Sequence, residues 1–226
     1  MIRYSILIPV YNAEKSLPIL LDKINHIDKK PEKIYVVDDG SCDSTSEMIE
    51  KFPVHGIKLE KNKGKGYALR VGFNKFLDSG DSEYLICMDA DLQHPVDFID
   101  NFLASINGGP QLLIGKRNRR LNQMPFLRIL SNMITSVILT RITGQTIEDS
   151  QCGFRLLDRN TLKRLELKED GFQLESEMII EAAKLDIPIR FINIPTIYNG
   201  NISNINHIGD TYRFIKLIMK QVVSSR

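Results

Sequence analysis

The sequence predicts an α/β protein with a mainly parallel sheet, helices on both faces of that sheet, and a helical C-terminal part. Two observations support this fold class. Short apolar, β-branched segments alternate with segments of helical spacing through the first half of the chain, which is typical of parallel sheets. Polar and acidic residues also gather directly after several of these segments, where parallel sheets bind ligands. At 226 residues, the chain fits a single domain.

Each strand of the first half is predicted from a short apolar segment. The predicted strands are "YSILIPV" (4–10), "KIYVVDD" (33–39), the shorter "GIKLEK" (56–61), "EYLICM" (83–88) and "QLLIG" (111–115). Helices are predicted between them at 13–27, 43–52, 65–79 and 95–106. Asp43 or Ser44 is suited to cap the second helix. The third helix places apolar residues on one face, including Ala68, Leu69, Phe73 and Phe76.

The second half is predicted to be richer in helix. The segment 124–143 is strongly apolar with few charges and predicts a helix. "GFRLLDRNTLKRL" (153–165) predicts a strand followed by a helix, 174–185 a helix, and "IPIRFINIP" (187–195) a strand. The tail 210–226 predicts a helix that carries aliphatic, aromatic and basic residues.

Composition bounds the class of protein. Hydrophobic residues make up 42% and charged residues 26% of the chain, which is ordinary for a globular enzyme-like domain. Cys42, Cys87 and Cys152 are odd in number and lack C-x-x-C spacing, which argues against a disulfide framework or a zinc site and fits a reducing cytosol. We find neither a signal-peptide pattern nor an apolar run of the ~18–20 residues that span a membrane. The expected location is cytoplasmic, either free or peripheral on the cytoplasmic face of the membrane.

Two carboxylates, Asp89 and Asp91, follow the strand 83–88 with one residue between them. Charged groups at the end of a buried strand are costly unless their charge is compensated. An Asp-x-Asp pair can hold a divalent cation that also binds substrate phosphates, as Mg²⁺ does with one or two carboxylates. Gln93 offers a further neutral oxygen. The alternative is a capping Asp beside a solvent-facing Asp, and the pair alone does not decide between them.

Two more loops carry candidate ligand-binding residues. Asp38 and Asp39, in "VVDDGS", end another strand, where an acid can bind ribose hydroxyls or a base edge; the same residues also suit a turn and helix cap. "NKGKGYA" (62–68) places glycines and lysines before a helix, which suits a phosphate-facing turn. By itself this last signal is weak.

The segment from Gln111 to Ile147 contains no acid. Its cations are Lys116, Arg117, Arg119, Arg120, Arg128 and Arg141. A block of one sign inside a chain of net charge +2 suggests an anionic partner, although a solvated basic loop would look the same. The apolar helices at 124–142 and 211–223 suit either a membrane interface or packing in a core or dimer. We predict no nucleic-acid partner.

Six stretches occur together in one order: "ILIPVYNAE", "VVDDGSCDST", "NKGKGYALRVGF", "MDADLQHP", "DSQCGFRLL" and "ESEMIIEAAKLDIPIRFINIP". In this order they resemble the inverting family-2 glycosyltransferases with the GT-A fold, and within them the polyprenyl-phosphate (dolichyl-phosphate) mannose and glucose synthase branch. The resemblance covers roughly residues 4–200. Two stretches, "GKRNRR" and "YNGNISNINHIG", differ from that branch, which leaves the sugar and the acceptor open.

The resemblance implies a GDP- or UDP-sugar donor, inversion at the sugar carbon, and Mg²⁺ or Mn²⁺ held by Asp89 and Asp91, with Gln93 as a further ligand. It also implies a role in cell-envelope glycan biosynthesis. The residues expected to bind the nucleotide sugar are Pro9, Tyr11, Glu14, Asp38, Asp39, Lys65, Asp89 and Ala90. The donor would occupy residues 1–118, and the acceptor would bind residues 119–226 with their amphipathic helices.

Two acceptors are compatible with these residues. A polyprenyl phosphate is already ionised and needs cations rather than a base; the candidates are Arg117, Arg120 and Arg128. A sugar hydroxyl needs a positioned base, for which Asp149 is the best candidate, with Glu177 or Glu175 behind it. The predicted catalytic residues are accordingly Asp91, Asp149 and Glu177. A catalytically silent nucleotide-sugar binder is the third hypothesis, and the intact Asp89 and Asp91 argue against it.

Overall fold

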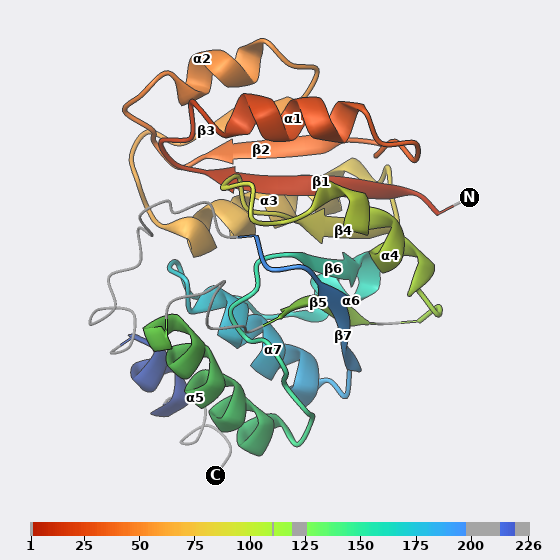
Figure 1. Ribbon diagram of the computed structural model, residues 1–226, viewed down its shortest axis with the longest axis vertical. Coiled ribbons are helices and arrows are strands. Elements are labelled where there is room, and N and C mark those ends of the chain that lie inside the picture. Colours follow the sequence, from red (N-terminus) through yellow and green to blue (C-terminus); the bar gives the residue numbers. More distant parts are fainter. Residues whose placement is uncertain (1, 110, 119–125, 198–212, 220–226) are drawn as a thin grey trace.

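The structure is a computed structural model that describes residues 2–109, 111–118, 126–197 and 213–219 (Figure 1). The strands are β1 (Tyr4–Val10), β2 (Ile34–Asp38), β3 (His55–Lys58), β4 (Tyr84–Cys87), β5 (Leu112–Arg117), β6 (Arg155–Asp158) and β7 (Ile189–Ile194). The helices are α1 (Leu17–Asn25), α2 (Thr45–Glu50), α3 (Lys65–Ser79), α4 (Ile99–Ala104), α5 (Phe126–Thr143), α6 (Arg159–Arg164) and α7 (Leu174–Lys184), with a 3₁₀ turn η1 (Val96–Phe98) before α4.

Every strand and helix predicted in the described residues is present, and the differences lie at the ends. The predicted helix 13–27 begins only at Leu17, because residues 13–16 form a turn and a proline stands in the first helical positions. The predicted helix 95–106 begins as the 3₁₀ turn η1. Of the two predicted caps of α2, Ser44 is the N-cap residue but makes no side-chain capping hydrogen bond, whereas Asp43 before it accepts from the Thr45 N–H (3.0 Å). Of the predicted tail helix, residues 213–219 are described and helical.

The seven strands form one sheet in the order β3-β2-β1-β4-β6-β5-β7. β6 runs antiparallel to both of its neighbours, β4 and β5, while the other paired strands are parallel. The carboxyl ends of the parallel strands therefore meet at one edge of the sheet. Because β6 is reversed, its amino end lies at that same edge. The residues just before β6 are thus brought to the ligand-binding edge.

The helices follow from the strand order. The chain moves from β1 to β2 and β3 in one direction, and then crosses back to β4 on the other side of β1. Right-handed crossovers place α3 on the opposite face from α1 and α2. α3 packs closely on β1, since a Cβ on Gly72 would lie 2.2 Å from a methyl group of Leu7. α5 packs on α7 at the end of the molecule away from α1 and α2 (Figure 1).

Three further findings bear on the expectations from composition. All three cysteines are free, Cys42 exposed and the other two buried. Burial raises the pKa of the Cys87 and Cys152 thiols to about 12, so these thiols are unreactive near neutral pH. Within the described parts of the chain, no helix is long and apolar enough to cross a membrane.

Candidate functional site

The site lies where the strand order reverses, at the carboxyl ends of β1 and β4. The loops that leave these strands contain Asn12 (φ 51°) and Leu92 (φ 63°), both in the left-handed backbone region that non-glycine residues seldom adopt. Asn12 accepts from the Cys42 N–H through its side chain (2.9 Å) and donates its own N–H to Ser41 Oγ (2.9 Å). The loops after β1 and β2 are therefore joined to each other at the edge.

The two acids that end β2 each organise a turn. Asp38 is buried and accepts from the Ser41 N–H (2.9 Å). Asp39 accepts from the backbone N–H groups of Lys63 and Gly64, at 2.8 Å each. Burial raises the pKa of Asp39, and these two hydrogen bonds only partly offset the effect. Asp39 thus fixes the glycine-lysine turn before α3 against the end of β2.

The remaining residues predicted to bind the nucleotide lie around the same loops. Pro9 is within β1 opposite Val37 of β2, and Tyr11 follows β1 with 38% of its surface exposed. Glu14 accepts from the Ser44 N–H (3.2 Å), at the start of α2. Ala90 is buried between the two acids of the Asp-x-Asp pair.

Lys65, the first residue of α3, lies between two carboxylates. Its Nζ is 2.6 Å from Asp89 Oδ1 and 2.8 Å from Glu175 Oε1 of α7. Burial alone would lower the pKa of Lys65, but the two carboxylates raise it above its ordinary value. Burial would raise the pKa of Asp89, yet the charge and hydrogen bond of Lys65, together with weaker contributions from His94 and Arg117, hold that pKa at about 2. Lys65 and Asp89 are therefore both ionised at neutral pH.

The backbone of Asp89 is held by His94. The Asp89 N–H donates to His94 Nδ1 (3.0 Å), and the imidazole is buried and stacked on Phe154. Burial, only partly offset by Asp89, lowers the pKa of His94 and keeps the imidazole neutral, as an acceptor must be. Asp91 is half-buried and accepts the Gln93 N–H (3.0 Å) at Oδ1. The residues that directly follow the Asp-x-Asp pair, Gln93 and His94, thus hold this turn in place through hydrogen bonds.

These residues fit a divalent metal. Two carboxylates share one ammonium, so negative charge is in excess even before Asp91 is counted. Gly153 keeps the space beside Asp89 open, since a Cβ there would lie 2.5 Å from Asp89 Oδ2. Carboxylate and amide oxygens are the donors that Mg²⁺ and Mn²⁺ prefer. Among the described residues, no group of three or more His, Cys, Asp or Glu side chains could hold a metal, so a metal would also need oxygens of a ligand.

A second ion pair lies at the same edge, between the end of β5 and the segment before β6. Arg117 donates from Nε to Asp149 Oδ2 (2.8 Å) and from Nη2 to Asp149 Oδ1 (2.9 Å). Asp149 also accepts from Asn132 Nδ2 of α5 (2.8 Å) and is fully buried. Burial would raise the pKa of Asp149, but Arg117 and these hydrogen bonds hold it below its ordinary value. Asp149 is therefore an ionised anchor for Arg117.

The two ion pairs belong to one site. The positive charge of Arg117 lowers the pKa values of both Asp89 and His94. This contribution is smaller than those of burial and of the nearer charges. Among the described residues, Arg117 Nη1 has no hydrogen-bond partner, although a guanidinium carries five N–H donors. These donors are available to a bound anion.

Not every predicted residue joins this cluster. Glu177 accepts from the N–H groups of Lys168 and Glu169 (2.9 Å each), so it fastens the segment before α7 instead of facing Lys65. Arg120 lies outside the described residues. Arg128 is in α5, but its side chain lies outside them as well.

Three residues of the cluster are not among the predicted site residues: Glu175, His94 and Asn132. Glu175 is expected from the sequence only as an alternative to Glu177. A signal existed there, because two glutamates two positions apart on a helix point to different sides, and only one can face the site. The sequence places His94 close after the Asp-x-Asp pair, where an imidazole nitrogen can accept a hydrogen bond from a backbone N–H of the turn. No local signal pointed to Asn132.

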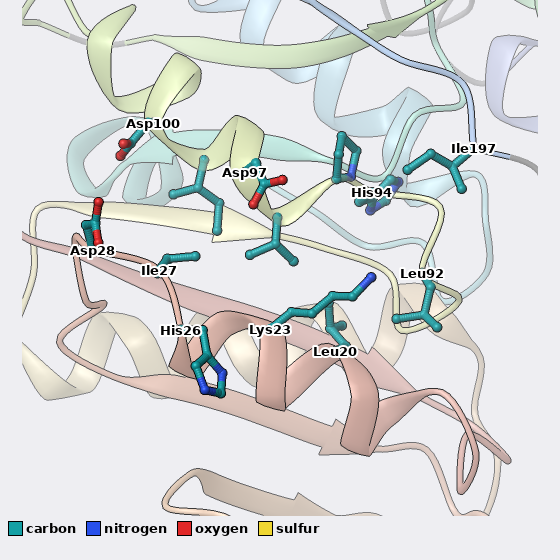
Figure 2. Close-up of a pocket in the computed structure, with 13 residues that line it drawn as sticks. Leu20, Lys23, His26, Ile27, Asp28, Leu92, His94, Asp97, Asp100 and Ile197 are labelled. Carbon is teal, nitrogen blue, oxygen red and sulfur yellow. The ribbon is translucent and has the colours of Figure 1, made fainter.

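A cavity of about 500 Å³ lies away from the acid pair. It lies between α1 and the turn η1, and Figure 2 shows Lys23 reaching into it from α1. Leu92 and His94 line it, whereas Asp89 and Asp91 do not. The cavity therefore adjoins the back of the Asp-x-Asp turn.

Comparison with known proteins identifies the family. The family model described as "Glycosyl transferase family 2" matches residues 5–166. Undecaprenyl-phosphate 4-deoxy-4-formamido-L-arabinose transferase of Proteus mirabilis is 34% identical over 71% of this chain and 50% of its own length. Dolichol-phosphate mannosyltransferase of Pyrococcus furiosus is 32% identical over 84% of this chain and 56% of its own. The chain thus spans about half the length of these relatives.

A solved structure shares the fold. Glucosyl-3-phosphoglycerate synthase of Mycobacterium tuberculosis, in complex with Mn²⁺, UDP-glucose and glycerol 3-phosphate, superposes with a TM-score of 0.71 at 19% identity, covering 98% of this chain and 79% of that one. At this identity the likeness concerns the fold, which is the GT-A fold. From the family match and the sequence relatives together, the chain belongs to glycosyl transferase family 2.

Proposed function

We propose that the protein transfers a sugar, with inversion, from a nucleoside diphosphate sugar to a polyprenyl phosphate, and that a divalent metal is required. A phosphate oxygen of the acceptor attacks the anomeric carbon as the bond from that carbon to the donor diphosphate breaks. One displacement from the opposite side inverts the configuration. The nucleoside diphosphate leaves with the electron pair of the broken bond.

The donor side of this proposal is supported by the excess negative charge around Lys65. Asp89 and Asp91, with Gln93, would hold Mg²⁺ or Mn²⁺, which supplies positive charge to the leaving diphosphate when bound. Lys65 would add a fixed cation beside the same phosphates. The loops after β1 and β2, with Tyr11, Glu14 and Asp39, would surround the nucleoside.

The acceptor side rests on one observation, the buried pair of Arg117 and Asp149. A general base works best with a pKa near the working pH, but the pKa of Asp149 is lowered and both of its oxygens accept hydrogen bonds. This arrangement disfavours proton removal from a sugar hydroxyl. It favours an acceptor that is already ionised and needs only a cation, which Arg117 provides through Nη1.

An exposed apolar surface on α5 supports an acceptor with an apolar part. α5 exposes one stripe of large apolar side chains, which comprises Leu130, Met133, Ile134 and Val137. Their spacing of three and four residues places them on one side of the helix. Exposed apolar residues gathered on one face commonly mark a surface that binds a lipid or a partner. The stripe would lie against the acceptor's hydrocarbon chain and the membrane surface.

The relatives support the same acceptor class. Both curated relatives are named as transferases for lipid-linked phosphates, undecaprenyl phosphate in one and dolichol phosphate in the other. The structural neighbour was solved with Mn²⁺ and UDP-glucose, a donor set that suits the oxygen ligands found here. These names do not decide between GDP and UDP, and the donor is proposed at the level of a nucleoside diphosphate sugar.

The proposal is tested by mixing the protein with UDP- and GDP-sugars, Mn²⁺ and a polyprenyl phosphate, and by following transfer of label into the lipid fraction. Arg117→Ala should raise the acceptor KM about ten- to a hundredfold, the value of a charge-assisted contact, and leave donor affinity nearly unchanged. Arg70→Ala, which removes a partly exposed arginine on α3, is the control. Transfer to sugar hydroxyls with Arg117→Ala near normal would instead identify a glycan acceptor and overturn the proposal.

A further inference from the structure

α5 exposes large apolar side chains and buries polar ones. Its outer face exposes Met133, Ile134 and Val137, each about half exposed at 48–51%. Its inner face buries Ile129 and Leu139, but it also buries two polar residues, Asn132 (1% exposed) and Ser136 (4%), against the segment that precedes β6. An ordinary surface helix places its apolar side inward. The polar contacts of the inner face therefore need a reason other than simple core packing.

Those contacts converge on Asn132. Its Nδ2 donates to Asp149 Oδ1 (2.8 Å), while its Oδ1 accepts from the Ser150 N–H (3.3 Å) and from Ser136 Oγ (3.2 Å). An ionised carboxylate can only accept hydrogen bonds, so the amide nitrogen must face Asp149. Both ends of the amide are satisfied in this one orientation. Asn132 thus joins Asp149 to α5, while the backbone N–H groups of Arg117 and Gln151 also donate to that carboxylate (3.2 Å each).

Asp149 in turn fixes the position of the Arg117 guanidinium. Arg117 donates three hydrogen bonds to Asp149, and the two from its guanidinium fix the plane of that group as well as its distance. The side chain of Arg117 is only 13% exposed, and that of Asp149 is fully buried, so neither can shift without losing these bonds. The direction of the free Nη1 donors is therefore set from α5 through Asn132 and Asp149.

We infer that Asn132 is a positioning residue for the acceptor, which links the apolar stripe of α5 to the guanidinium of Arg117. The inference rests on the proposed function and deepens it. The helix that would carry the hydrocarbon chain also sets the cation that would bind the phosphate at its end. Asn132 and Asp149 thus form one hydrogen-bonded connection between α5 and the guanidinium of Arg117.

Asn132→Leu, which keeps the volume and removes the amide, tests the connection. It should raise the KM for polyprenyl phosphate about tenfold, with kcat at saturating acceptor and donor affinity nearly unchanged. Thr140→Val is the matched control. It also removes a hydrogen bond from α5, to the Ile147 N–H (2.9 Å), but does not touch Asp149. Asn132→Ser is the second variant, in case the leucine disturbs folding.

A double-mutant cycle separates positioning from general loosening of the helix. Because Asn132 acts through Arg117, adding Asn132→Leu to Arg117→Ala should raise the acceptor KM no further. Independent effects, or equal effects of Asn132→Leu and Thr140→Val, would overturn the inference.

A readout without acceptor keeps the two proposals distinguishable. The NMR resonance of the Arg117 Nε–H reports its hydrogen bond to Asp149, and it should move in Asn132→Leu and Asn132→Ser but not in Thr140→Val. If this resonance shifts but the wild-type protein does not transfer a sugar to polyprenyl phosphate, the proposed acceptor is wrong and Asn132 still positions Arg117. If it stays unchanged, the inference on Asn132 is wrong whatever the acceptor.

Discussion

Two clusters of paired charges lie at the same edge of the sheet, and they differ in the charges and hydrogen-bond donors that they leave without a partner. Around Lys65, one ammonium meets the carboxylates of Asp89 and Glu175, so the cluster keeps an excess of negative charge. Between Arg117 and Asp149, the charges balance, and free N–H donors remain on the guanidinium. The first cluster is suited to attract a cation with its diphosphate. The second is suited to receive an anion.

Burial of a charge pair therefore does not by itself define its role. Both pairs are held by residues from distant parts of the chain, and both shift pKa values away from their ordinary range. The two clusters differ in their net charge and in the number of hydrogen-bond donors that remain unused. A mutation should accordingly affect donor and acceptor binding separately, according to the cluster it alters.

The largest effect on catalysis is expected from Asp91→Asn, in the cluster proposed to bind the donor. Removing one of the charges proposed to hold the metal should lower kcat/KM for transfer at least a hundredfold, about 3 kcal/mol of transition-state stabilisation, and abolish metal-dependent donor binding. Calorimetry with UDP- or GDP-sugars, with and without Mn²⁺, measures the binding. Asp97→Asn, which changes an exposed acid in η1, should behave as wild type. Full activity of Asp91→Asn, or of the wild type in excess chelator, would remove the metal from the proposal.

Asp149→Asn tests the acceptor cluster through stability. It leaves the charge of Arg117 without its partner, and breaking a buried pair costs about 3–5 kcal/mol of unfolding free energy. Urea unfolding at pH 7 measures the loss. Asp170→Asn breaks a much more exposed pair with Arg70 and should cost less than about 1 kcal/mol. Equal losses in the two variants would contradict the described burial.

The same variant has a defined pH dependence. The pKa of Asp149 is lowered from 3.8 in the folded protein, so the unfolded chain binds the proton more readily. The stabilisation is therefore fully present above the unfolded pKa and is lost as pH falls toward the folded one. The difference in stability between wild type and Asp149→Asn should be constant from about pH 5 to 7 and shrink below pH 3.8. A difference that grows on acidification would show that Asp149 is not held as an anion.

A smaller effect is expected from Asp39→Ala. Its carboxylate holds the backbone of the turn before α3, so its loss should weaken donor binding about tenfold, or about 1.4 kcal/mol, without altering kcat at saturating donor. Equilibrium binding of the nucleotide sugar and steady-state kinetics measure the two quantities. A large fall in kcat would show that Asp39 takes part in the transfer step, and would contradict its proposed role in donor binding alone.

The smallest effect concerns the outer stripe of α5. Ile134→Ser and Val137→Ser should each weaken partition onto vesicles of phosphatidylglycerol and phosphatidylethanolamine by about 1 kcal/mol, because each half-exposed side chain has limited apolar area left to bury. Sedimentation with vesicles measures the partition. Ile19→Ser, at a similarly exposed isoleucine of α1, should have no effect. Loss of binding in this control as well would indicate a general surface effect instead of a lipid-facing helix.

The strands and helices, and the edge of the sheet where acidic residues gather, follow from the amino-acid sequence alone. Runs of apolar residues with periods of two or 3.6 are local signals, so β1, α3 and β4 could be predicted from their own segments. The acids at strand ends were equally visible, because a parallel sheet brings the carboxyl ends of its strands to one edge. The apolar helix α5 and the basic segment before it could also be predicted in this way.

Which of these groups meet depends on the tertiary structure. Lys65 pairs with Glu175, 110 positions away, and Arg117 with Asp149 because the reversed strand β6 brings that segment to the ligand edge. Spacing along the chain contains no such information, since these contacts depend on strand order and direction. The same limit explains Glu177, whose side chain fastens a neighbouring segment, and Asn132, whose amide faces Asp149 only because α5 lies beside the segment before β6. Local periodicity sets which residues share a face, and long-range packing sets what that face touches.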